Sequence, residues 1–412
     1  MKGKLIMQKT RKKLILFISL IFIFFTSGVY FILSFTIPEN TVIYSGEKDS
    51  CFIPEATSWL LSSGKTPSSP VMQNSAEKLT SSEKEHGYTT TVYLCNFIPV
   101  KTVRVSVIDE TAVTPGGQAV GINLRTKGIL VANLSDIKLS TGEEVCPAKD
   151  AGLRPGDIIE KINGEKMTSK EDVVKAVENS SGILNVEGTH HSDSRLWKIK
   201  PAYDKNGSIK IGAWVRDTVA GVGTLTYCTD EGFGALGHPI SDIDTGNYVE
   251  SDGGSIFEAR VVGIDKSEKG EPGSIRAVFS GSKIGEIRKN SDCGVFGISS
   301  VNSKNKIPVA SKKEITPGDA EIICDIGNGV ERFDVAIRKI INGTDASKSI
   351  LIQVTDEELL EKTGGIVQGM SGSPLVQNGK LIGAVTHVFV NDPTRGYGIF
   401  IENMLAEAEK IK

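Results

Sequence analysis

The chain has 412 residues, of which 39% are hydrophobic, so it is long enough to bury two or three cores. A formal net charge of -3 and an aromatic content of 6% argue against a nucleic-acid binder, which needs a basic face and rings that stack on bases. None of the six cysteines forms a C-x-x-C pair, so zinc-ribbon chemistry has no support, and we expect neither a metal nor a cofactor.

The first 37 residues predict one transmembrane helix. Six lysines and arginines precede a nearly unbroken apolar run from Leu14 to Ile37. At about 1.5 Å per residue, this run crosses a hydrocarbon core of roughly 30 Å. The positive residues stay in the cytoplasm, so the rest of the chain is exported. A cleaved signal peptide is the alternative, but its apolar region is only about 7 to 15 residues long and ends at a small-residue cleavage site.

Residues 38–100 are rich in Ser, Thr, Lys and Glu, and we interpret them as a spacer between the membrane and the folded domains. Short strands are expected at Thr41–Tyr44 and Thr91–Asn96. Cys51 and Cys95 bracket the most irregular part of this segment. A disulfide between them is one possibility, and isolated buried thiols are the other.

Residues 101–200 predict a small α+β domain. Strands are expected at Val103–Val107 and Gly128–Ala132, and a capping-box pattern from Thr168 to Glu171 marks the start of a helix. The run A-G-L-R-P-G-D-I-I-E-K-I-N-G from Ala151 resembles the signature of a PDZ domain.

The PDZ resemblance implies a peptide-binding site. Four residues, Ala119, Val120, Gly121 and Ile122, fall where the carboxylate-binding loop of that family lies. Such a domain binds a peptide as an added strand and holds its terminal carboxylate with backbone N–H groups. A PDZ-like spacer with a closed groove is the alternative.

The segment 201–412 contains many short β-rich runs punctuated by glycine, which predicts an all-β barrel or sandwich. Its length is sufficient for two small barrels. Only Glu402–Ile411 has a helical pattern.

The sequence G-M-S-G-S-P at Gly369–Pro374 predicts a nucleophile. A serine hydroxyl needs an exposed position, a base and an oxyanion site. Glycines on both sides of Ser371 allow a sharp turn in which the N–H groups of Gly369 and Ser371 point at one developing oxyanion. The motif, followed by a hairpin signal at Asn378–Gly379, resembles the nucleophile region of chymotrypsin-like serine peptidases.

A serine nucleophile needs a histidine base, and three of the five histidines fall in the predicted spacer or PDZ domain: His86, His190 and His191. Of the other two, we choose His238 over His387, because His238 lies among small residues and precedes the serine, as in the chymotrypsin order. Metal binding by the His190 cluster, or by His238 with Asp242 and Asp244, matches no established ligand spacing.

The whole arrangement resembles the stage IV sporulation protein B family of serine peptidases from endospore-forming bacteria. The likeness rests on the anchor, the PDZ signature, G-A-L-G-H-P-I-S-D-I-D around His238 and G-G-I-V-Q-G-M-S-G-S-P around Ser371. It implies a mainly β fold in which a PDZ domain is followed by a chymotrypsin-like double barrel.

The same resemblance implies Asp356 as the acidic member of the triad. A physical objection is that the aspartate of two-barrel enzymes precedes the serine by about a hundred residues, so other aspartates stay open. These are Asp242, Asp244, Asp325 and Asp334.

Family members are signalling proteases of the space between the forespore membranes. The resemblance implies that this chain cleaves itself near the N-terminus and cuts a membrane-bound regulator. That cut would activate an intramembrane protease that matures a sigma factor, with the PDZ domain governing self-recognition and substrate presentation. The alternative is an adapter that recruits a partner through its PDZ groove and carries an inactive peptidase-like domain.

Overall fold

The computed structural model describes residues 24, 26–44, 61–65, 87–95, 97–108, 112–190, 193–242, 246, 248–299, 305–341, 343 and 345–411. Two compact units make up the chain, residues 1–111 with 342–345 and residues 112–341 with 346–411 and the terminal lysine. Several residues named above lie outside the described part: Cys51, His86, His191, Asp244 and the first half of the expected anchor.

In the N-terminal unit, the described part of the expected spacer forms a four-stranded sheet of order β1-β4-β3-β2. Its strands are β1 (Asn40–Tyr44), β2 (Leu61–Lys65), β3 (Gly87–Leu94) and β4 (Ile98–Ile108). Leu33 and Ile37, at the end of a helix over residues 26–36, are buried with Val92 and Val103 in one apolar cluster. Among the described residues, no helix is both long and apolar enough to cross a membrane.

The strand expected at Val103–Val107 therefore belongs to β4 in the N-terminal unit, and not to the PDZ domain. The alternation of apolar residues predicted a strand correctly, because one face of this sheet packs against the helix. Alternation does not show to which domain a strand belongs, so the assignment to the PDZ domain was wrong.

The PDZ domain contains two helices, α2 (Pro147–Asp150) and α3 (Lys170–Glu178). Its strands and short ladders are the second half of β6 (Ala119–Leu134), β7 (Ile137–Lys138), β8 (Glu144–Val145), β9 (Ile158–Ile162), β10 (Glu165–Lys166), β11 (Leu184–His190), β12 (Asp193–Ile199), β13 (Ala202–Tyr203) and β14 (Ile209–Lys210). The capping box of α3 is one residue later than predicted, because Ser169 and Asp172 exchange the two hydrogen bonds.

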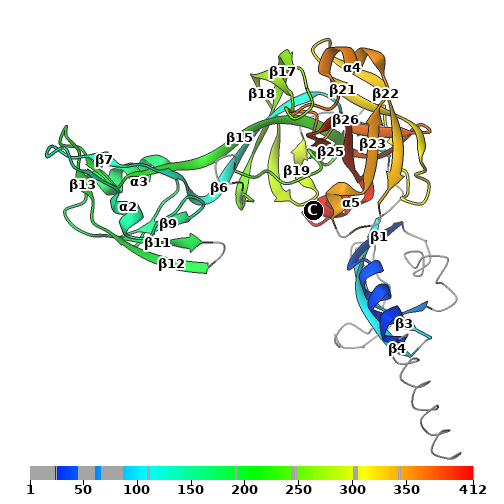
Figure 1. Cartoon of the computed structure of the whole chain (residues 1–412), viewed down its shortest axis with the longest axis horizontal. Helices are drawn as coiled ribbons and strands as arrows, with labels where there is room; N and C mark the ends of the chain where they lie inside the picture. Colours follow the sequence, from blue (N-terminus) through cyan, green and yellow to red (C-terminus); the bar gives the residue numbers. More distant parts are fainter. Residues whose placement is uncertain are drawn as a thin grey trace, which may run out of the picture. The chain divides into compact units, whose positions relative to one another are not determined.

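The PDZ domain is inserted between two strands of the first barrel. Strand β6 pairs with β15 (Ala213–Cys228) from Ala119↔Thr224 to Leu134↔Ala213, with two register shifts between. The N-terminal half of β6 and the C-terminal half of β15 lie in the barrel, and their other halves lie in the PDZ domain (Figure 1). The expected boundary at residue 200 is therefore not a border between two consecutive domains, because the first barrel takes strands from both sides of the PDZ domain in the sequence.

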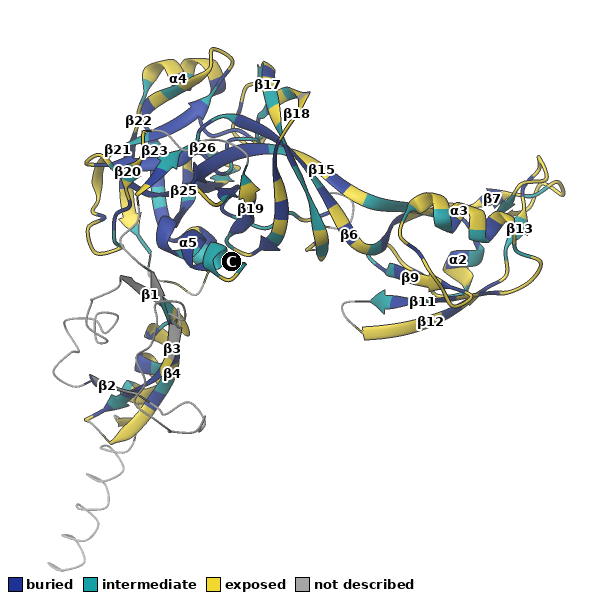
Figure 2. Cartoon of the chain, turned by 180° about the vertical axis from the view of Figure 1, so that it is seen from behind, coloured by how far each residue is buried: buried dark blue, intermediate teal, exposed yellow. Residues whose placement is uncertain are grey.

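The first barrel is a ring of six strands, β6-β17-β18-β19-β16-β15, which closes through the β6–β15 pairing. Its further strands are β16 (Phe233–Ala235), β17 (Ser251–Asp265), β18 (Ser274–Ser291) and β19 (Gly294–Ser299), with β5 (Ala112–Pro115) and β20 (Ile307–Pro308) extending the sheet beside β15. Buried apolar side chains, among them Ile122, Leu225 and Val295, form its core. Figure 2 colours stretches of these strands dark blue, as buried.

The second barrel is closed in the order β21-β22-β23-β26-β25-β24. These strands are β21 (Gly318–Asp325), β22 (Val330–Ile340), β23 (Ile350–Val354), β24 (Pro374–Gln377), β25 (Lys380–Phe389) and β26 (Asp392–Phe400). Helix α4 (Glu357–Thr363) precedes the predicted nucleophile turn, and α5 (Ile401–Glu409) ends the chain as expected. The prediction of two small β-barrels is confirmed.

Candidate active site

Both ends of the nucleophile turn are fixed by the strands around it. The N–H of Gln368 donates to Gly273 O and the carbonyl of Gln368 accepts from Ile275 N, both at 2.8 Å. On the other side, Val385 N donates to Ser373 O at 2.9 Å. Met370 is fully buried in the core of the second barrel, whereas Ser371 beside it is half-buried. The turn therefore holds Ser371 between two anchored ends.

Strand β15 of the first barrel holds the same turn from the opposite side. Thr224 donates from its N–H to Ser371 O at 2.9 Å and from its hydroxyl to Gly369 O at 2.8 Å. The buried hydroxyl of Thr226 donates to Gly372 O at 2.8 Å. Three carbonyls of the turn thus point at β15. The role of these two threonines was not predicted from the sequence, because the pattern of a β-rich run does not show which group a side chain will bond to.

The glycines of the turn are required by backbone conformation and by space. Gly369 has φ +98° and Gly372 has φ +95°, a region that other residues rarely adopt. A Cβ on Gly372 would lie 2.1 Å from Thr224 O and 2.5 Å from Leu236 N. The nucleophile turn therefore contacts both β15 and the segment before His238 at this glycine.

We expect Gly372→Ala to lower the free energy of unfolding by roughly 2–5 kcal/mol, because left-handed strain and overlap with two backbones act together. Gly379→Ala is the matched control, since Gly379 also has positive φ (+75°) but open space around it. Its loss is expected near ~1 kcal/mol, from the backbone strain alone. Equal losses in urea denaturation would contradict the close contact at Gly372.

An oxyanion site is available at the turn. Among the described residues, neither the N–H of Gly369 nor that of Ser371 donates a hydrogen bond, whereas the N–H groups of Met370 and Gly372 are used by Val367 O and Val385 O. Two unused donors next to the nucleophile are what a tetrahedral intermediate requires. Gly369 and Ser371 are the pair that the sequence predicts for the oxyanion, and this role stays a prediction.

His238 follows a strained turn. Leu236 has φ +70°, which is uncommon for a residue with a branched side chain, and Gly237 follows at φ +71°. A Cβ on Gly237 would touch Thr386 and Ala384 of β25. The turn therefore lies against β25, and the ring of His238 comes within 5.4 Å of the ring of His387, centroid to centroid. Backbone strain of this kind clusters at functional sites.

Ser371 lies at the same part of β25. Its hydroxyl donates to Thr386 O at 2.9 Å, one residue before His387. Ser371 and His238, which are 133 positions apart in the sequence, thus both approach the Thr386–His387 stretch of β25. In this conformation the hydroxyl is bonded to a carbonyl and not to an imidazole, so productive proton transfer requires a rotation of the Ser371 side chain.

The environment of His238 suits a general base. Burial lowers the pKa of this imidazole, and the hydrogen bond to Pro239 O opposes that effect. Nδ1 lies 2.8 Å from Pro239 O, so Nδ1 carries the proton and donates, which leaves Nε2 as the acceptor. A backbone carbonyl therefore fixes the tautomer here, as a carboxylate does in a Ser-His-Asp triad.

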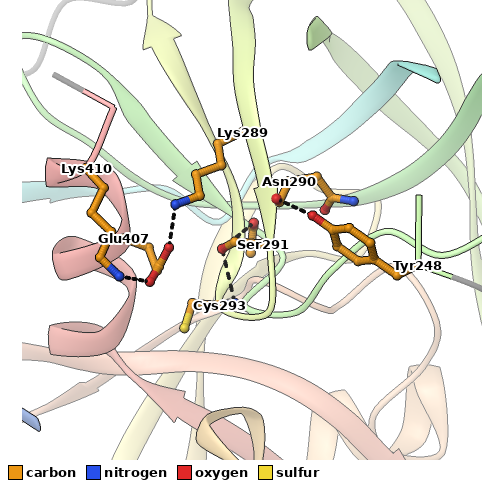
Figure 3. Close-up of polar contacts among 8 residues, drawn as sticks. Tyr248, Lys289, Asn290, Ser291, Cys293, Glu407 and Lys410 are labelled. Carbon is orange, nitrogen blue, oxygen red and sulfur yellow. Dashed lines mark hydrogen bonds and ion pairs between the residues drawn. The ribbon is translucent and has the colours of Figure 1, made fainter. Parts of the chain in front are cut away.

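The loop after His238 is anchored by a buried asparagine. Asn290, at the end of β18, accepts from Ile240 N at 2.9 Å and donates to Ile240 O and Val249 O, both at 3.0 Å. Tyr248 OH donates to the backbone O of Asn290 at 2.7 Å (Figure 3). Asn290 lies outside any motif and could not be predicted from the sequence, yet it fixes both ends of the loop that follows the base.

Next to Asn290, an ion cluster ties β18 to the C-terminal helix. Lys289 Nζ lies 2.7 Å from the carboxylate of Glu407, which also pairs with Lys410 (Figure 3). Burial raises the pKa of the nearby Cys293 thiol to about 12, which disfavours its thiolate form at neutral pH. In the described residues, all five cysteines are free: Cys95, Cys146, Cys228, Cys293 and Cys324.

Among the described residues, Asp356 and His238 share no hydrogen bond or ion pair. Its carboxylate caps helix α4 by accepting from Leu359 N at 2.9 Å, and it also accepts from Asp334 N at 3.3 Å. Thr386, beside the serine, bonds Ser347 O just before β23, whereas Asp356 lies beyond the other end of that strand. At roughly 3.3 Å per residue, β23 carries the chain more than 10 Å from the site.

We expect Asp356→Asn to preserve both turnover and stability, because asparagine caps a helix as well as aspartate does. Asp356→Ala should lower the free energy of unfolding by ~1 kcal/mol through the lost cap. Turnover of a peptide substrate and chemical denaturation measure the two effects. A fall of several hundred-fold in kcat for Asp356→Asn, with unchanged stability, would restore Asp356 to the triad.

The other aspartates considered from the sequence also have different roles. Asp242 is buried and pairs with Arg216 at 3.4 Å. Asp325 accepts from the N–H groups of Gly327 and Gly329 in a turn. Asp334 contributes its backbone O to Thr355 and Asp356.

The four residues predicted for the PDZ carboxylate-binding loop lie elsewhere. Ala119, Val120, Gly121 and Ile122 form the buried start of β6, between β15 on one edge and β17 on the other. Their backbone groups serve the first barrel and cannot receive a peptide terminus. The prediction was wrong because no sequence motif indicates that the PDZ domain is inserted between two long strands, β6 and β15, that also belong to the first barrel.

The structure contains no group of three or more His, Cys, Asp and Glu side chains suited to a metal ion among its described residues. His190 pairs through Nδ1 with the buried carboxylate of Asp157, whose other oxygen accepts from Arg154 N at 2.7 Å. This pair stabilises the turn before β9.

Comparison with known proteins extends these observations. A model of the SpoIVB peptidase S55 family matches residues 207–405, and a PDZ-domain model matches residues 140–184. No curated protein matches the sequence.

Several solved structures are similar in part. One is an inactive-form mutant of Rv3671c from M. tuberculosis H37Rv, with 16% identity, coverage of 46% of this chain and 83% of that chain, and a TM-score of 0.27. Another is a serine endoprotease from Yersinia pestis, with 18% identity, coverage of 46% and 57%, and a TM-score of 0.29. The segment that holds both Ser371 and His238 matches the SpoIVB peptidase S55 family, and the chain is a serine endopeptidase with a PDZ domain.

Proposed function

We propose that this protein is a membrane-tethered signalling endopeptidase of sporulation, which cleaves itself near the N-terminus and then cuts a membrane-bound regulator of an intramembrane protease. The observation that supports the peptidase chemistry is the surroundings of the half-buried Ser371. Beside it are two backbone N–H groups that donate no hydrogen bond among the described residues, and the ring of His238 lies next to that of His387 on the adjacent strand β25. The signalling role rests on the family resemblance.

The proposed mechanism is acyl transfer by Ser371. Its hydroxyl rotates from Thr386 O towards His238 Nε2 and attacks the peptide carbonyl, while His238 takes the proton. The N–H groups of Gly369 and Ser371 hold the oxyanion. His238 then gives the proton to the leaving amine, and water releases the acyl group by the same steps in reverse order. Pro239 O holds the Nδ1 proton throughout.

The tether and the self-cleavage follow from the N-terminal sequence. A basic stub before the apolar run Leu14–Ile37 favours insertion with the peptidase exported, into the space between the forespore membranes in a sporulating cell. The Ser- and Thr-rich stretches after this run suit cleavage, since exposed polar segments are where nicking is easiest. Cleavage there releases the peptidase from the membrane.

A reconstitution tests this function. The whole chain is inserted into lipid vesicles, and N-terminal sequencing locates the fragment that appears with time. We expect cleavage between residues 38 and 100, transfer of the peptidase to the soluble fraction, and neither event in the Ser371→Ala variant. A membrane-bound regulator added to the vesicles should then be cut by the released enzyme. A peptidase that digests unfolded casein but leaves both its own spacer and the regulator intact would refute the signalling role.

A further inference from the structure

One of the two candidate oxyanion donors is oriented by a strand of the other barrel. In the peptide group between Gln368 and Gly369, the carbonyl of Gln368 accepts from Ile275 N of β18 at 2.8 Å. The carbonyl and the N–H of a trans peptide point in opposite directions, so this bond turns the N–H of Gly369 away from β18. The first barrel therefore sets the direction of this donor.

The other candidate donor is oriented within the nucleophile turn itself. The N–H of Ser371 shares its peptide group with the carbonyl of Met370, which accepts from Ser373 N at 2.9 Å. This contact is made two residues further along the same turn. The two donors thus differ in what holds them, and only that of Gly369 depends on a contact between the barrels.

The loop between β17 and β18, residues 266–273, braces the segment that leads to Gly369. Gly273 accepts from Gln368 N at 2.8 Å, just before Ile275 makes its own bond. At the other end of the loop, Ser267 N donates to Thr363 O at 2.8 Å, at the end of α4. Figure 1 shows the β17–β18 hairpin beside α4. Both ends of the loop therefore hold the segment 363–368.

The side chain of Ser267 joins these two ends. Its buried hydroxyl accepts from Gly273 N at 2.8 Å and donates to Ile366 O at 3.1 Å. The approach is close, because a Cβ on Gly364 would lie 2.3 Å from Ser267 O. Removal of the hydroxyl leaves a buried donor and a buried acceptor without this partner, which is costly in such surroundings. One hydroxyl thus links the loop to itself and to the segment before the oxyanion donor.

We infer that Ser267 is a positioning residue for the oxyanion site. By fixing loop 266–273 it keeps Gly273 and Ile275 bonded to Gln368, and so keeps the Gly369 N–H directed at the substrate carbonyl. Without the hydroxyl, the Gln368–Gly369 peptide group is free to rotate and one of the two donors is lost from the site. This inference deepens the proposed function and rests on it, since it assumes that Gly369 holds the oxyanion.

The first test compares Ser267→Ala with the parent in the whole chain. The probe is a fluorophosphonate, whose phosphoryl oxygen occupies the oxyanion site when Ser371 is labelled. Since loss of a whole donor costs about 10²–10³-fold, we expect partial misorientation to slow labelling roughly 10–100-fold. For turnover of fluorescent casein, kcat should fall by a similar factor and KM should change less than about threefold.

Ser274→Ala is the matched control, because its hydroxyl donates to Asp265 Oδ2 at 3.1 Å on the exposed side of the same hairpin. Its labelling rate should stay within about twofold of the parent rate. If Ser267→Ala does not fold, Ser267→Cys takes its place, since it keeps the side-chain volume and has only a weak donor. Equal labelling of the parent and the folded variant overturns the inference, as does a changed KM with an unchanged kcat.

A second measurement needs no turnover. Amide hydrogen exchange is followed in the Ser371→Ala background, on fragments that contain residues 273–277 and 367–369. We expect slow exchange of the Ile275 and Gln368 amides, and faster exchange after Ser267→Ala, while the amides of β23 are unchanged. A parent that is not labelled would count against the proposed function, and exchange would still decide whether Ser267 holds this segment. Rapid exchange at Ile275 before the substitution, or no change after it, overturns the inference.

Discussion

Replacing Ser371 with alanine is expected to reduce kcat for peptide hydrolysis roughly 10⁶-fold while the fold is retained. The hydroxyl makes a single hydrogen bond, to Thr386 O, and Ser371 is only half-buried, so its loss lowers the free energy of unfolding by about 1 kcal/mol. Measurements of peptide turnover and of urea denaturation on the same preparation separate the two effects. Turnover within tenfold of the parent would exclude Ser371 as the nucleophile.

Labelling with a fluorophosphonate gives a second readout, with the neighbouring serine as its control. Ser373 is fully buried and its hydroxyl lies 3.5 Å from that of Thr224, so it is inaccessible to the reagent. We expect Ser373→Ala to retain labelling and Ser371→Ala to lose it. If the parent is not labelled either, the conformation in which Ser371 bonds Thr386 O persists in solution, and the adapter reading gains support.

The second large effect is expected at His238. Removing a general base lowers kcat by roughly 10²–10⁴-fold, so His238→Ala should fall in this range. His387→Gln is the matched control. His387 lies on β25, and its ring is adjacent to that of His238, but we do not expect it to act as the base. We expect that control to change KM more than kcat. The reverse pattern would make His387 the base.

The pH profile provides an independent check on the same residue. Burial lowers the pKa of His238, so the neutral imidazole that accepts the serine proton persists at a lower pH than for an exposed histidine. Activity should rise with pH through a pKa below the ordinary value of about 6.5 and be complete by neutrality. Folding stability has the same sign, because the unfolded chain binds the proton more tightly, and it falls as pH drops below about 6.5. An activity midpoint above that value would contradict the buried environment.

The local parts of the site were predictable from sequence, and the long-range parts were not. The nucleophile turn was found because glycines at 369 and 372 mark a conformation that only a few turns require. His238 was found by elimination among five histidines. Both predictions came from short segments in which the residue types themselves indicate the chemistry.

The arrangement of domains needed information that no short segment holds. Strands β6 and β15 are each 16 residues long and serve the PDZ domain at one end and the barrel at the other. Each strand has a short, mainly polar stretch in its middle, Asn123–Gly128 in β6 and Arg216–Thr218 in β15, but these residues do not indicate that the strand passes from one domain to another. For this reason the carboxylate-binding loop was assigned to Ala119–Ile122, which lie in the barrel.

Asp356 shows a third limit. An aspartate just before a helix caps it whether or not it also serves a catalytic site, and the sequence alone does not distinguish these roles. Asn290 shows the converse, because its three hydrogen bonds to the base loop depend on a contact between residues 50 positions apart.

The insertion of the PDZ domain bears on how the chain reaches its native state. Closing the first barrel requires Asn123 to meet Ala220, and the entropy lost in joining such distant residues grows with the logarithm of the intervening length. If the inserted domain forms first, it brings Leu134 next to Ala213, and the remaining pairs form by zipping outward from that point as a hairpin does. The order of synthesis favours this route, since the ribosome completes the insertion before it makes the barrel half of β15. The PDZ domain then acts as an intramolecular nucleus for the peptidase, and mutations that destabilise it should appear as slow folding and degradation in the cell.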